Sequence, residues 1–212
     1  EEVANPLSGA NATIMGDVPY SGLTMMGQAL ELNNDNITKL PTGAMFDNRY
    51  TIVEPLGEGG MGMVYQAIDK KTKQLIALKV LRPELAKNKQ VIDSLVQEVS
   101  LGQKLNHPHL LQIRHLEERG DTPYVVMELL DGGDVDEMLA ARGGKLSIDE
   151  TLKIVKAITS ALSALHKESV IHLDIKPENI LLSKSGLIRL ADFGISSKLK
   201  DQKEGHSGAG TL

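Results

Sequence analysis

The stretch His172-Leu173-Asp174-Ile175-Lys176-Pro177-Glu178-Asn179 carries the strongest signal in this 212-residue sequence. It packs an acid, a cation and an amide between a predicted helix and a predicted strand. Asp174 can orient a hydroxyl and accept its proton, Lys176 can neutralise a moving phosphoryl group, and Asn179 can bind a metal ion. A solvated loop is the alternative, and the combination of three such residue types argues against it.

A second acidic motif, Asp192-Phe193-Gly194, lies 13 residues beyond Asn179 and directly follows the strand-like run 187–191. Asp192 is a candidate ligand that would hold Mg²⁺ against phosphates. The same three residues occur in ordinary turns, so the motif gains weight from its position after Asn179.

A glycine-rich segment, Gly57-Glu58-Gly59-Gly60-Met61-Gly62-Met63-Val64, lies nearer the N-terminus. Glycines allow backbone N–H groups to approach phosphate oxygens without a Cβ in the way. The segment lies between strand-like runs at 50–53 and 63–68, and no Gly-Lys-Ser/Thr closes it. It therefore favours a hairpin that covers phosphates over a dinucleotide-binding turn or a Walker A loop. Its candidate phosphate-binding residues are Gly57, Gly59, Gly60 and Gly62.

Lys79 lies among apolar residues in a third predicted strand, 75–81. A lysine at the edge of a sheet that extends its amino group to solvent would explain this position. The functional interpretation is a cation that grips phosphates and is held by a carboxylate. Glu98, in a helix predicted from Lys89 to Leu105, is the candidate partner, although alone it would be an ordinary surface glutamate.

The remaining pattern predicts an α+β fold with two lobes. Residues 1–44 are rich in Gly, Pro and Asn and predict a flexible segment. Residues 45–130 predict a small lobe of five strands and one helix, with the last two strands at 110–114 and 124–129. Residues 131–212 predict a mainly helical lobe. Its helices are expected at 135–142 and, behind a capping box of Ser147 and Glu150, up to about residue 167.

In this order the motifs resemble the eukaryotic-type (Hanks-type) serine/threonine protein kinase family, in the style of its bacterial members. The resemblance covers residues 49–212 and implies a bilobal kinase fold with ATP and Mg²⁺ in the cleft. It implies that Lys79 pairs with Glu98, that Asp174 is the catalytic aspartate with Lys176 beside it, and that Asn179 and Asp192 hold Mg²⁺.

The resemblance also implies how adenosine is bound. Residues 127–130 look like the hinge between the lobes, with Met127 as the gatekeeper and the backbones of Glu128 and Leu130 bonded to adenine. Asp134 falls where the family often contacts ribose. The adenine ring would lie between Val64, Ala77 and Leu181.

The sequence departs from the family pattern at two places. Leu173 stands where many kinases have an arginine that pairs with a phosphorylated activation segment. We therefore expect weak dependence on phosphorylation at Ser196, Ser197, Ser207 and Thr211. The family's final helices do not follow Thr211, so an apolar stripe on the long helix is expected to lack part of its cover: Leu152, Val155, Ile158, Leu162 and Leu165.

Three explanations fit this truncated C-lobe. The rest of the kinase lies outside this sequence, another subunit or self-association completes a short chain, or the chain is a remnant that binds nucleotide and phosphorylates poorly. The functional hypotheses follow from these. The first is a serine/threonine protein kinase, the second a kinase-derived nucleotide-binding or interaction module, and the third a small-molecule phosphotransferase. The complete glycine loop and Lys176 disfavour the third.

Composition limits the partners. The formal net charge is −5 and no long basic stretch is present, which argues against nucleic acid. No apolar run approaches the roughly 20 residues of a membrane helix. The chain has no cysteine, which fits a reducing cytoplasm and excludes disulfides and thiolate metal sites. We expect a protein substrate. A repeated Thr-(Ile/Met)-Met-Gly at Thr13 and Thr24 would suit a phosphothreonine-binding domain, with coincidence as the alternative.

Overall fold

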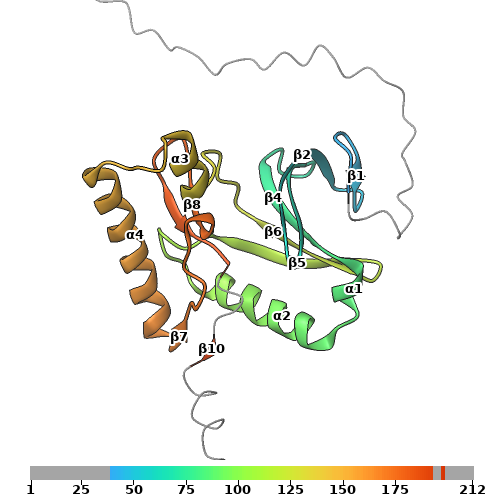
Figure 1. The fold of residues 1–212 in the computed structure, drawn as a ribbon. Helices are drawn as coiled ribbons and strands as arrows, with labels where there is room; N and C mark the ends of the chain where they lie inside the picture. Colours follow the sequence, from blue (N-terminus) through green and yellow to red (C-terminus); the bar gives the residue numbers. More distant parts are fainter. Residues whose placement is uncertain (1–38, 193–196, 199–212) are drawn as a thin grey trace, which may run out of the picture.

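The computed structural model describes residues 39–192 and 197–198, which form a curled antiparallel sheet and a mainly helical part joined by one connection (Figure 1). Several predicted features lie outside these residues. They are the Thr13 and Thr24 repeats, Phe193-Gly194, and the candidate phosphorylation sites Ser196, Ser207 and Thr211.

The sheet contains the five predicted strands and one short additional strand, in the order β1-β2-β3-β4-β6-β5. Their bounds are β1 Met45–Phe46, β2 Tyr50–Gly59, β3 Gly62–Asp69, β4 Leu75–Leu81, β5 Ile113–Arg119 and β6 Thr122–Met127. The predicted strand at 50–53 continues to Gly59, because the glycine-rich segment itself takes part in the β2–β3 ladder. The strand predicted at 110–114 begins later, since Leu110 and Leu111 pair with Leu190 instead.

The helices are α1 Pro83–Ala86, α2 Lys89–Lys104, α3 Val135–Ala141 and α4 Ile148–Lys167. Helices α2, α3 and α4 each begin at a side chain that accepts a backbone N–H group, whereas α1 has no side-chain cap. Asn88 accepts the N–H of Gln90 at the start of α2. The predicted capping box of Ser147 and Glu150 opens α4. The C-terminal part also contains β7 Val170–Ile171, a 3₁₀ turn Pro177–Asn179, β8 Ile180–Leu182, β9 Ile188–Leu190 and β10 Ser197–Lys198.

One hydrophobic cluster covers the outer face of the sheet. The side chains of β4 alternate, so Ile76, Leu78 and Val80 join this cluster while the intervening residues face the other side. Leu40 is only 4% exposed in the same cluster, and its N–H donates to the Tyr65 hydroxyl. Residues 39–44, which we expected to be flexible, are thus anchored to the sheet by a buried side chain.

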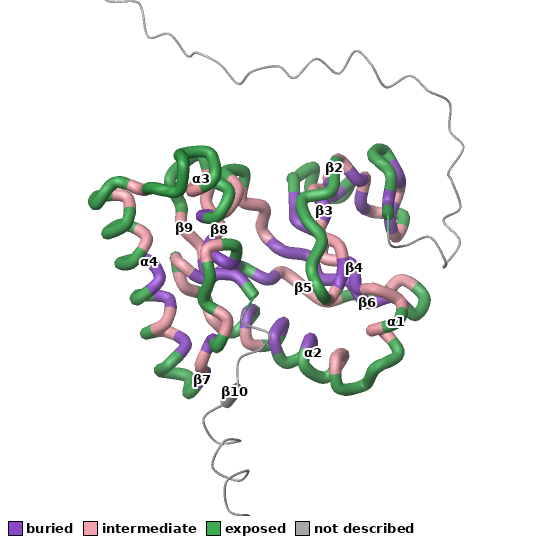
Figure 2. Tube along the Cα trace, viewed as in Figure 1, coloured by how far each residue is buried: buried purple, intermediate pink, exposed green. Residues whose placement is uncertain are grey.

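The other cluster runs from the inner face of the sheet through α2 into the C-terminal part, as the buried segments in Figure 2 show. Leu165 of α4 is fully buried there, whereas Leu152 and Val155 are 48% and 51% exposed. The apolar stripe of α4, expected to lack part of its cover, is covered toward its C-terminal half and exposed at Leu152 and Val155. Among the described residues, no helix is long and apolar enough to cross a membrane.

Candidate active site

The register of the sheet gathers four candidate nucleotide-binding residues on one face. Val64 pairs directly with Lys79, and Ala77 pairs directly with Met127. Residues opposite each other in an antiparallel pair project to the same face. Ala77 and Lys79 are two positions apart on β4, so all four side chains lie on the inner face. This is the face that looks toward the C-terminal part.

The glycine-rich segment closes as the hairpin between β2 and β3, with Gly59 paired to Gly62. A Cβ added at Gly62 would lie 2.0 Å from the Val80 carbonyl oxygen, so only glycine allows β3 to approach β4 so closely there. A Cβ at Gly57, Gly59 or Gly60 would meet nothing within 4 Å. The hairpin tip is therefore free of packing contacts at these three residues, and its backbone is accessible.

Lys79 pairs with Asp192 in this structure, not with Glu98 as the sequence analysis expected. Its Nζ donates to Asp192 Oδ1 at 2.7 Å, and no Lys79–Glu98 ion pair forms among the described residues. Burial would lower the pKa of Lys79, but the charges of Asp192 and Glu98 outweigh it and raise that pKa. Glu98 is buried beside this pair, and its burial raises its own pKa. A desolvated ammonium needs a carboxylate in contact, and Asp192 is the one that reaches it.

A network of hydrogen bonds holds the catalytic-loop candidates. The Asn179 side-chain amide donates to the backbone oxygen of Asp174 at 2.8 Å and to Asp174 Oδ2 at 2.9 Å. Lys176 Nζ lies 3.3 Å from the same Oδ2. The backbone N–H of Ala191 donates to the Asn179 carbonyl at 2.8 Å, which ties the loop to the residue before Asp192. Asp174, Lys176 and Asn179 thus form one cluster beside Asp192.

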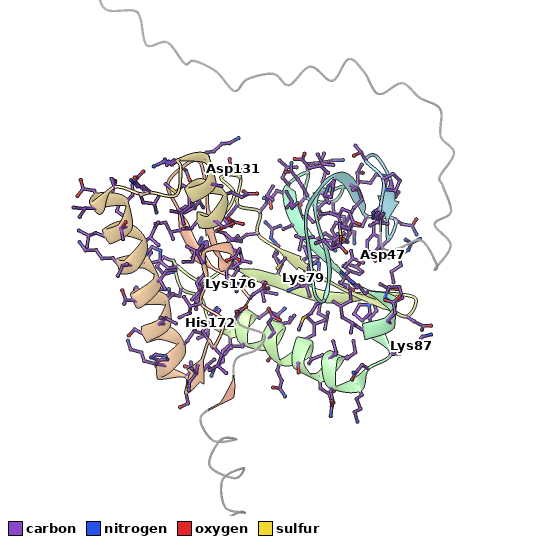
Figure 3. All side chains as sticks on the ribbon, in the orientation of Figure 1. Asp47, Lys79, Lys87, Asp131, His172 and Lys176 are labelled. Atoms are coloured by element: carbon purple, nitrogen blue, oxygen red, sulfur yellow. The ribbon has the colours of Figure 1, made fainter. Side chains whose placement is uncertain are left out.

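The hydrogen bonds keep Asp174 ionised. The Asn179 amide, and then Lys176, lower the pKa of Asp174 below its usual range. An ionised carboxylate with one oxygen held by these donors is suited to accept a proton at its other oxygen. Figure 3 shows Lys79 and Lys176 in the region where the sheet meets the C-terminal part.

His172 connects the loop that carries Asp174 to Ala191 through hydrogen bonds of its ring. Its side chain is 1% exposed, its Nε2 donates to the Ala191 carbonyl at 3.0 Å, and its Nδ1 accepts the Asp174 N–H at 3.3 Å. Both ring nitrogens are satisfied by a neutral imidazole, and burial lowers the pKa of His172 accordingly. Our sequence analysis assigned His172 no role. Nothing in the order of residues indicates that its ring would bridge two segments.

Two non-glycine residues of the site adopt left-handed backbone conformations. Leu173 has a φ of 64° and Asp192 a φ of 55°. Such conformations cost about 1–3 kcal/mol each and persist where surrounding contacts fix them, most often at functional sites. Here the fixed neighbours are His172 and Asn179, which hold the segments on either side. In this conformation the Asp192 carboxylate contacts Lys79 at 2.7 Å.

The donor set of Asn179 and Asp192 fits a hard divalent cation. Because both Asn179 N–H groups donate to Asp174, the amide Oδ1 is left to act as a ligand. Asp192 is exposed, so one of its oxygens can take part while the other contacts Lys79. Two oxygen ligands alone do not complete the coordination of a metal ion, and among the described residues no group of three His, Cys, Asp or Glu could hold one. Phosphate oxygens and water would have to complete the coordination.

The connection between the lobes presents backbone groups and carries Asp134. Glu128 is fixed by its side chain, which accepts the Gln112 N–H at 2.8 Å and lies 3.0 Å from Arg189 Nε. Asp134 caps α3, with its Oδ1 accepting the Glu137 N–H at 2.8 Å, and pairs through its backbone with Leu181. Leu181 packs against the same cluster as Val64. The structure therefore links Asp134 to Leu181 and places Leu181 and Val64 against one hydrophobic cluster.

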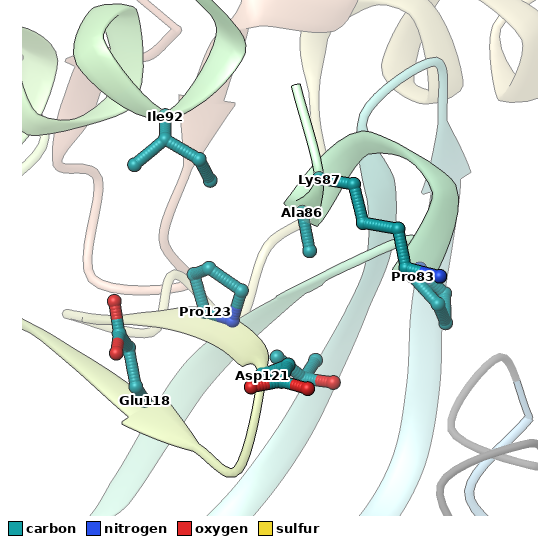
Figure 4. Close-up of a pocket in the computed structure, with 8 residues that line it drawn as sticks. Pro83, Ala86, Lys87, Ile92, Glu118, Asp121 and Pro123 are labelled. Carbon is teal, nitrogen blue, oxygen red and sulfur yellow. The ribbon is translucent and has the colours of Figure 1, made fainter. Parts of the chain in front are cut away.

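A cavity among the described residues lies away from this region. It occupies about 460 Å³ between α1, α2 and the β5–β6 hairpin, and Figure 4 shows its lining. Its lining residues include Lys87, Glu118 and Pro123, and none of the residues predicted to bind nucleotide. We therefore assign the candidate site from the polar network and the sheet face rather than from cavity size.

The fold is that of a protein kinase, and comparison with known proteins agrees. Residues 50–212 match the protein kinase domain family. The chain is 35% identical over 165 residues to the serine/threonine-protein kinase PrkC of Bacillus subtilis, covering 78% of this chain and 25% of PrkC. It is 34% identical over 155 residues to the probable serine/threonine-protein kinase pknA2 of Bifidobacterium longum, covering 72% and 20%.

Solved structures give the same result. A crystal structure of the Mycobacterium tuberculosis PknI kinase domain, a double mutant, superposes with a TM-score of 0.66 at 34% identity, covering 75% of this chain and 65% of that one. The chain belongs to the protein kinase domain family, and its relatives among bacterial serine/threonine kinases place it close to those members. It spans about a quarter of the length of the curated relatives.

Proposed function

We propose that this chain is the nucleotide-binding part of a serine/threonine protein kinase that transfers the γ-phosphate of ATP to a hydroxyl of a protein. The observation that carries the proposal is the polar cluster of Asp174, Lys176 and Asn179 beside the Lys79–Asp192 pair. An ammonium, an ionised carboxylate and two oxygen ligands meet where the sheet face and the catalytic loop converge. Phosphoryl transfer needs this positioning and charge stabilisation more than covalent participation of the protein.

In this proposal the adenine ring lies between Val64 and Ala77 on one side and Leu181 on the other. The Leu130 N–H and the Glu128 carbonyl form no hydrogen bond within the described residues, so both are available to adenine. Asp134 retains one carboxylate oxygen for ribose beyond the one that caps α3. The glycine-rich hairpin covers the phosphates with its backbone N–H groups.

Asn179 Oδ1 and Asp192 would hold Mg²⁺, which when bound neutralises charge on the phosphates. Asp174 orients the incoming hydroxyl and accepts its proton, because the Asn179 amide keeps its carboxylate ionised. Lys176, 3.3 Å from that carboxylate, stabilises negative charge on the transferred group. Lys79 releases one oxygen of Asp192 or shares it when the phosphates arrive. Glu98, buried nearby, is then positioned to take over the ammonium.

The exposed part of α4 favours a second possibility. Ile148, Leu152 and Val155 are 79%, 48% and 51% exposed along one helix. Burial of each such side chain is worth roughly 1.5–3 kcal/mol, so the chain gains stability when this stripe is covered. A nucleotide-binding module that becomes an active kinase only when a partner or further chain covers α4 would fit this observation.

The experiment that tests the proposal compares the purified chain with Asp174→Asn in a radiolabelled ATP assay on a mixed protein substrate. We expect transfer by the original chain and a loss of about 100-fold or more in the variant. Equal signals would remove catalysis from this chain. Nucleotide binding without transfer in both would favour the module that needs its α4 stripe covered.

A further inference from the structure

Arg82 connects the glycine-rich hairpin to the helices of the small lobe. It follows β4 directly and is the N-cap residue of α1, where its carbonyl accepts the N–H groups of Leu85 and Ala86. Helix α1 leads into α2, which carries Glu98. The residue therefore sits where β4, the strand that pairs with β3 of the hairpin, turns into the helical segment.

Three contacts run from Arg82 to the hairpin. Its backbone N–H donates to the Met61 carbonyl at 3.1 Å, and its Nη2 donates to Glu58 Oε1 at 2.8 Å and to the Gly59 carbonyl at 3.2 Å. The hairpin tip comprises residues 57–62. Since side chains at Gly57, Gly59 and Gly60 would touch nothing, these bonds replace the packing that the tip lacks.

The contact with Gly59 fixes the direction of a peptide group. The Gly59 carbonyl and the Gly60 N–H belong to one planar peptide, and the described residues contain no cis peptide bond. In a trans peptide the carbonyl and the N–H point in opposite directions. Holding the carbonyl on Arg82 therefore directs the Gly60 N–H away from Arg82 and leaves it unpaired for a phosphate oxygen.

We infer that Arg82 is a positioning residue for nucleotide binding, which acts by holding the Gly59–Gly60 peptide and the tip of the hairpin in place. This inference rests on the proposed ATP binding and adds a residue that acts through the hairpin backbone. The guanidinium is 39% exposed and Glu58 is 58% exposed, so the ion pair itself contributes little to global stability. Its effect is on the conformation of the hairpin tip, where side chains at Gly57, Gly59 and Gly60 would meet nothing within 4 Å.

The test measures ATP affinity and exchange of the hairpin amides in Arg82→Ala, Arg82→Lys and a control. Lys87→Ala is the matched control, because it removes one exposed cation five residues away that has no hydrogen bond to the hairpin. We expect Arg82→Ala to weaken ATP binding about five-fold, the size of one ordinary hydrogen bond lost, because the contact is partly exposed to solvent, with kcat reduced much less. Arg82→Lys should recover part of the affinity, and Lys87→Ala should bind as the original chain does.

Hydrogen–deuterium exchange provides the readout that does not depend on ATP binding or on activity. We expect faster exchange at the amides of residues 58–62 in Arg82→Ala, unchanged exchange in α4, and the original pattern in Lys87→Ala. If the original chain binds no nucleotide, the proposed function fails, and this exchange still decides whether Arg82 holds the tip. Unchanged exchange in Arg82→Ala, or equal losses of affinity in Arg82→Ala and Lys87→Ala, would overturn the inference.

Discussion

Substitution of Gly62 by alanine should open the hairpin where it meets β4. The added Cβ would lie 2.0 Å from the Val80 carbonyl oxygen, 2.9 Å from the Val80 carbonyl carbon and 3.0 Å from the Leu81 Cα, and all three are backbone atoms. No rotation of a side chain relieves such a contact. The strands must separate by about 1 Å, and overpacking of this kind typically costs about 1–3 kcal/mol.

The measurement is thermal unfolding without nucleotide. For a domain of this size, each kcal/mol lowers the unfolding temperature by about 2–4 °C, so we expect Gly62→Ala to unfold about 2–12 °C below the original chain. Gly60→Ala is the matched control, because its Cβ meets nothing within 4 Å. It should be neutral or slightly stabilising, since alanine restricts the unfolded chain. Equal unfolding temperatures for the two variants would refute the close approach of β3 to β4.

Two further predictions concern buried ionisable groups. Asp69 accepts hydrogen bonds from Arg49 at 3.1 and 2.7 Å, and this pairing lowers the pKa of Asp69. The stability that this ion pair contributes should be complete above about pH 4 and lost as the pH falls further. Asp69→Asn should therefore lower the free energy of unfolding, measured with urea, by about 3 kcal/mol at pH 7, and the difference from the original chain should be smaller at pH 3. A difference that does not change with pH would contradict the ion pair. Burial lowers the pKa of His172, so the unfolded chain binds its proton more readily and the free energy of unfolding should fall below about pH 6.5. His172→Gln should reduce this slope between pH 7.5 and 5.5, and an unchanged slope would show that His172 is not buried as a neutral imidazole.

The sequence predicted the elements and residue types of the site better than their contacts. The glycine hairpin, Lys79, Asp174, Asn179 and Asp192 could be found because each lies in a short motif with its own chemical reason. The strand alternation that places Ala77 and Lys79 on one face also follows from local pattern. These features depend on residues that are close together in the sequence, so they can be recognised from the sequence alone.

Features that depend on distant segments could not be predicted. Lys79 contacts Asp192 across 113 positions and not the expected Glu98. Which of two nearby carboxylates a lysine contacts depends on the tertiary structure and not on the local sequence. Leu40 was assigned to a flexible segment, yet it is buried against the sheet. Arg82 carries no motif that would distinguish it from a surface arginine. Each of these assignments needs coordinates, since no local pattern encodes it.

Magnesium-dependent ATP binding tests most directly whether Lys79, Asn179 and Asp192 share one nucleotide site. Calorimetry on the original chain should give ATP binding that strengthens when Mg²⁺ is added. Asp192→Asn should abolish most of that gain while the affinity measured without Mg²⁺ stays close to the original value, because the substitution removes a metal ligand and leaves Lys79 to meet the phosphates. If Asp192→Asn keeps the full gain from Mg²⁺, or if the original chain binds no ATP at all, these residues do not form the site described.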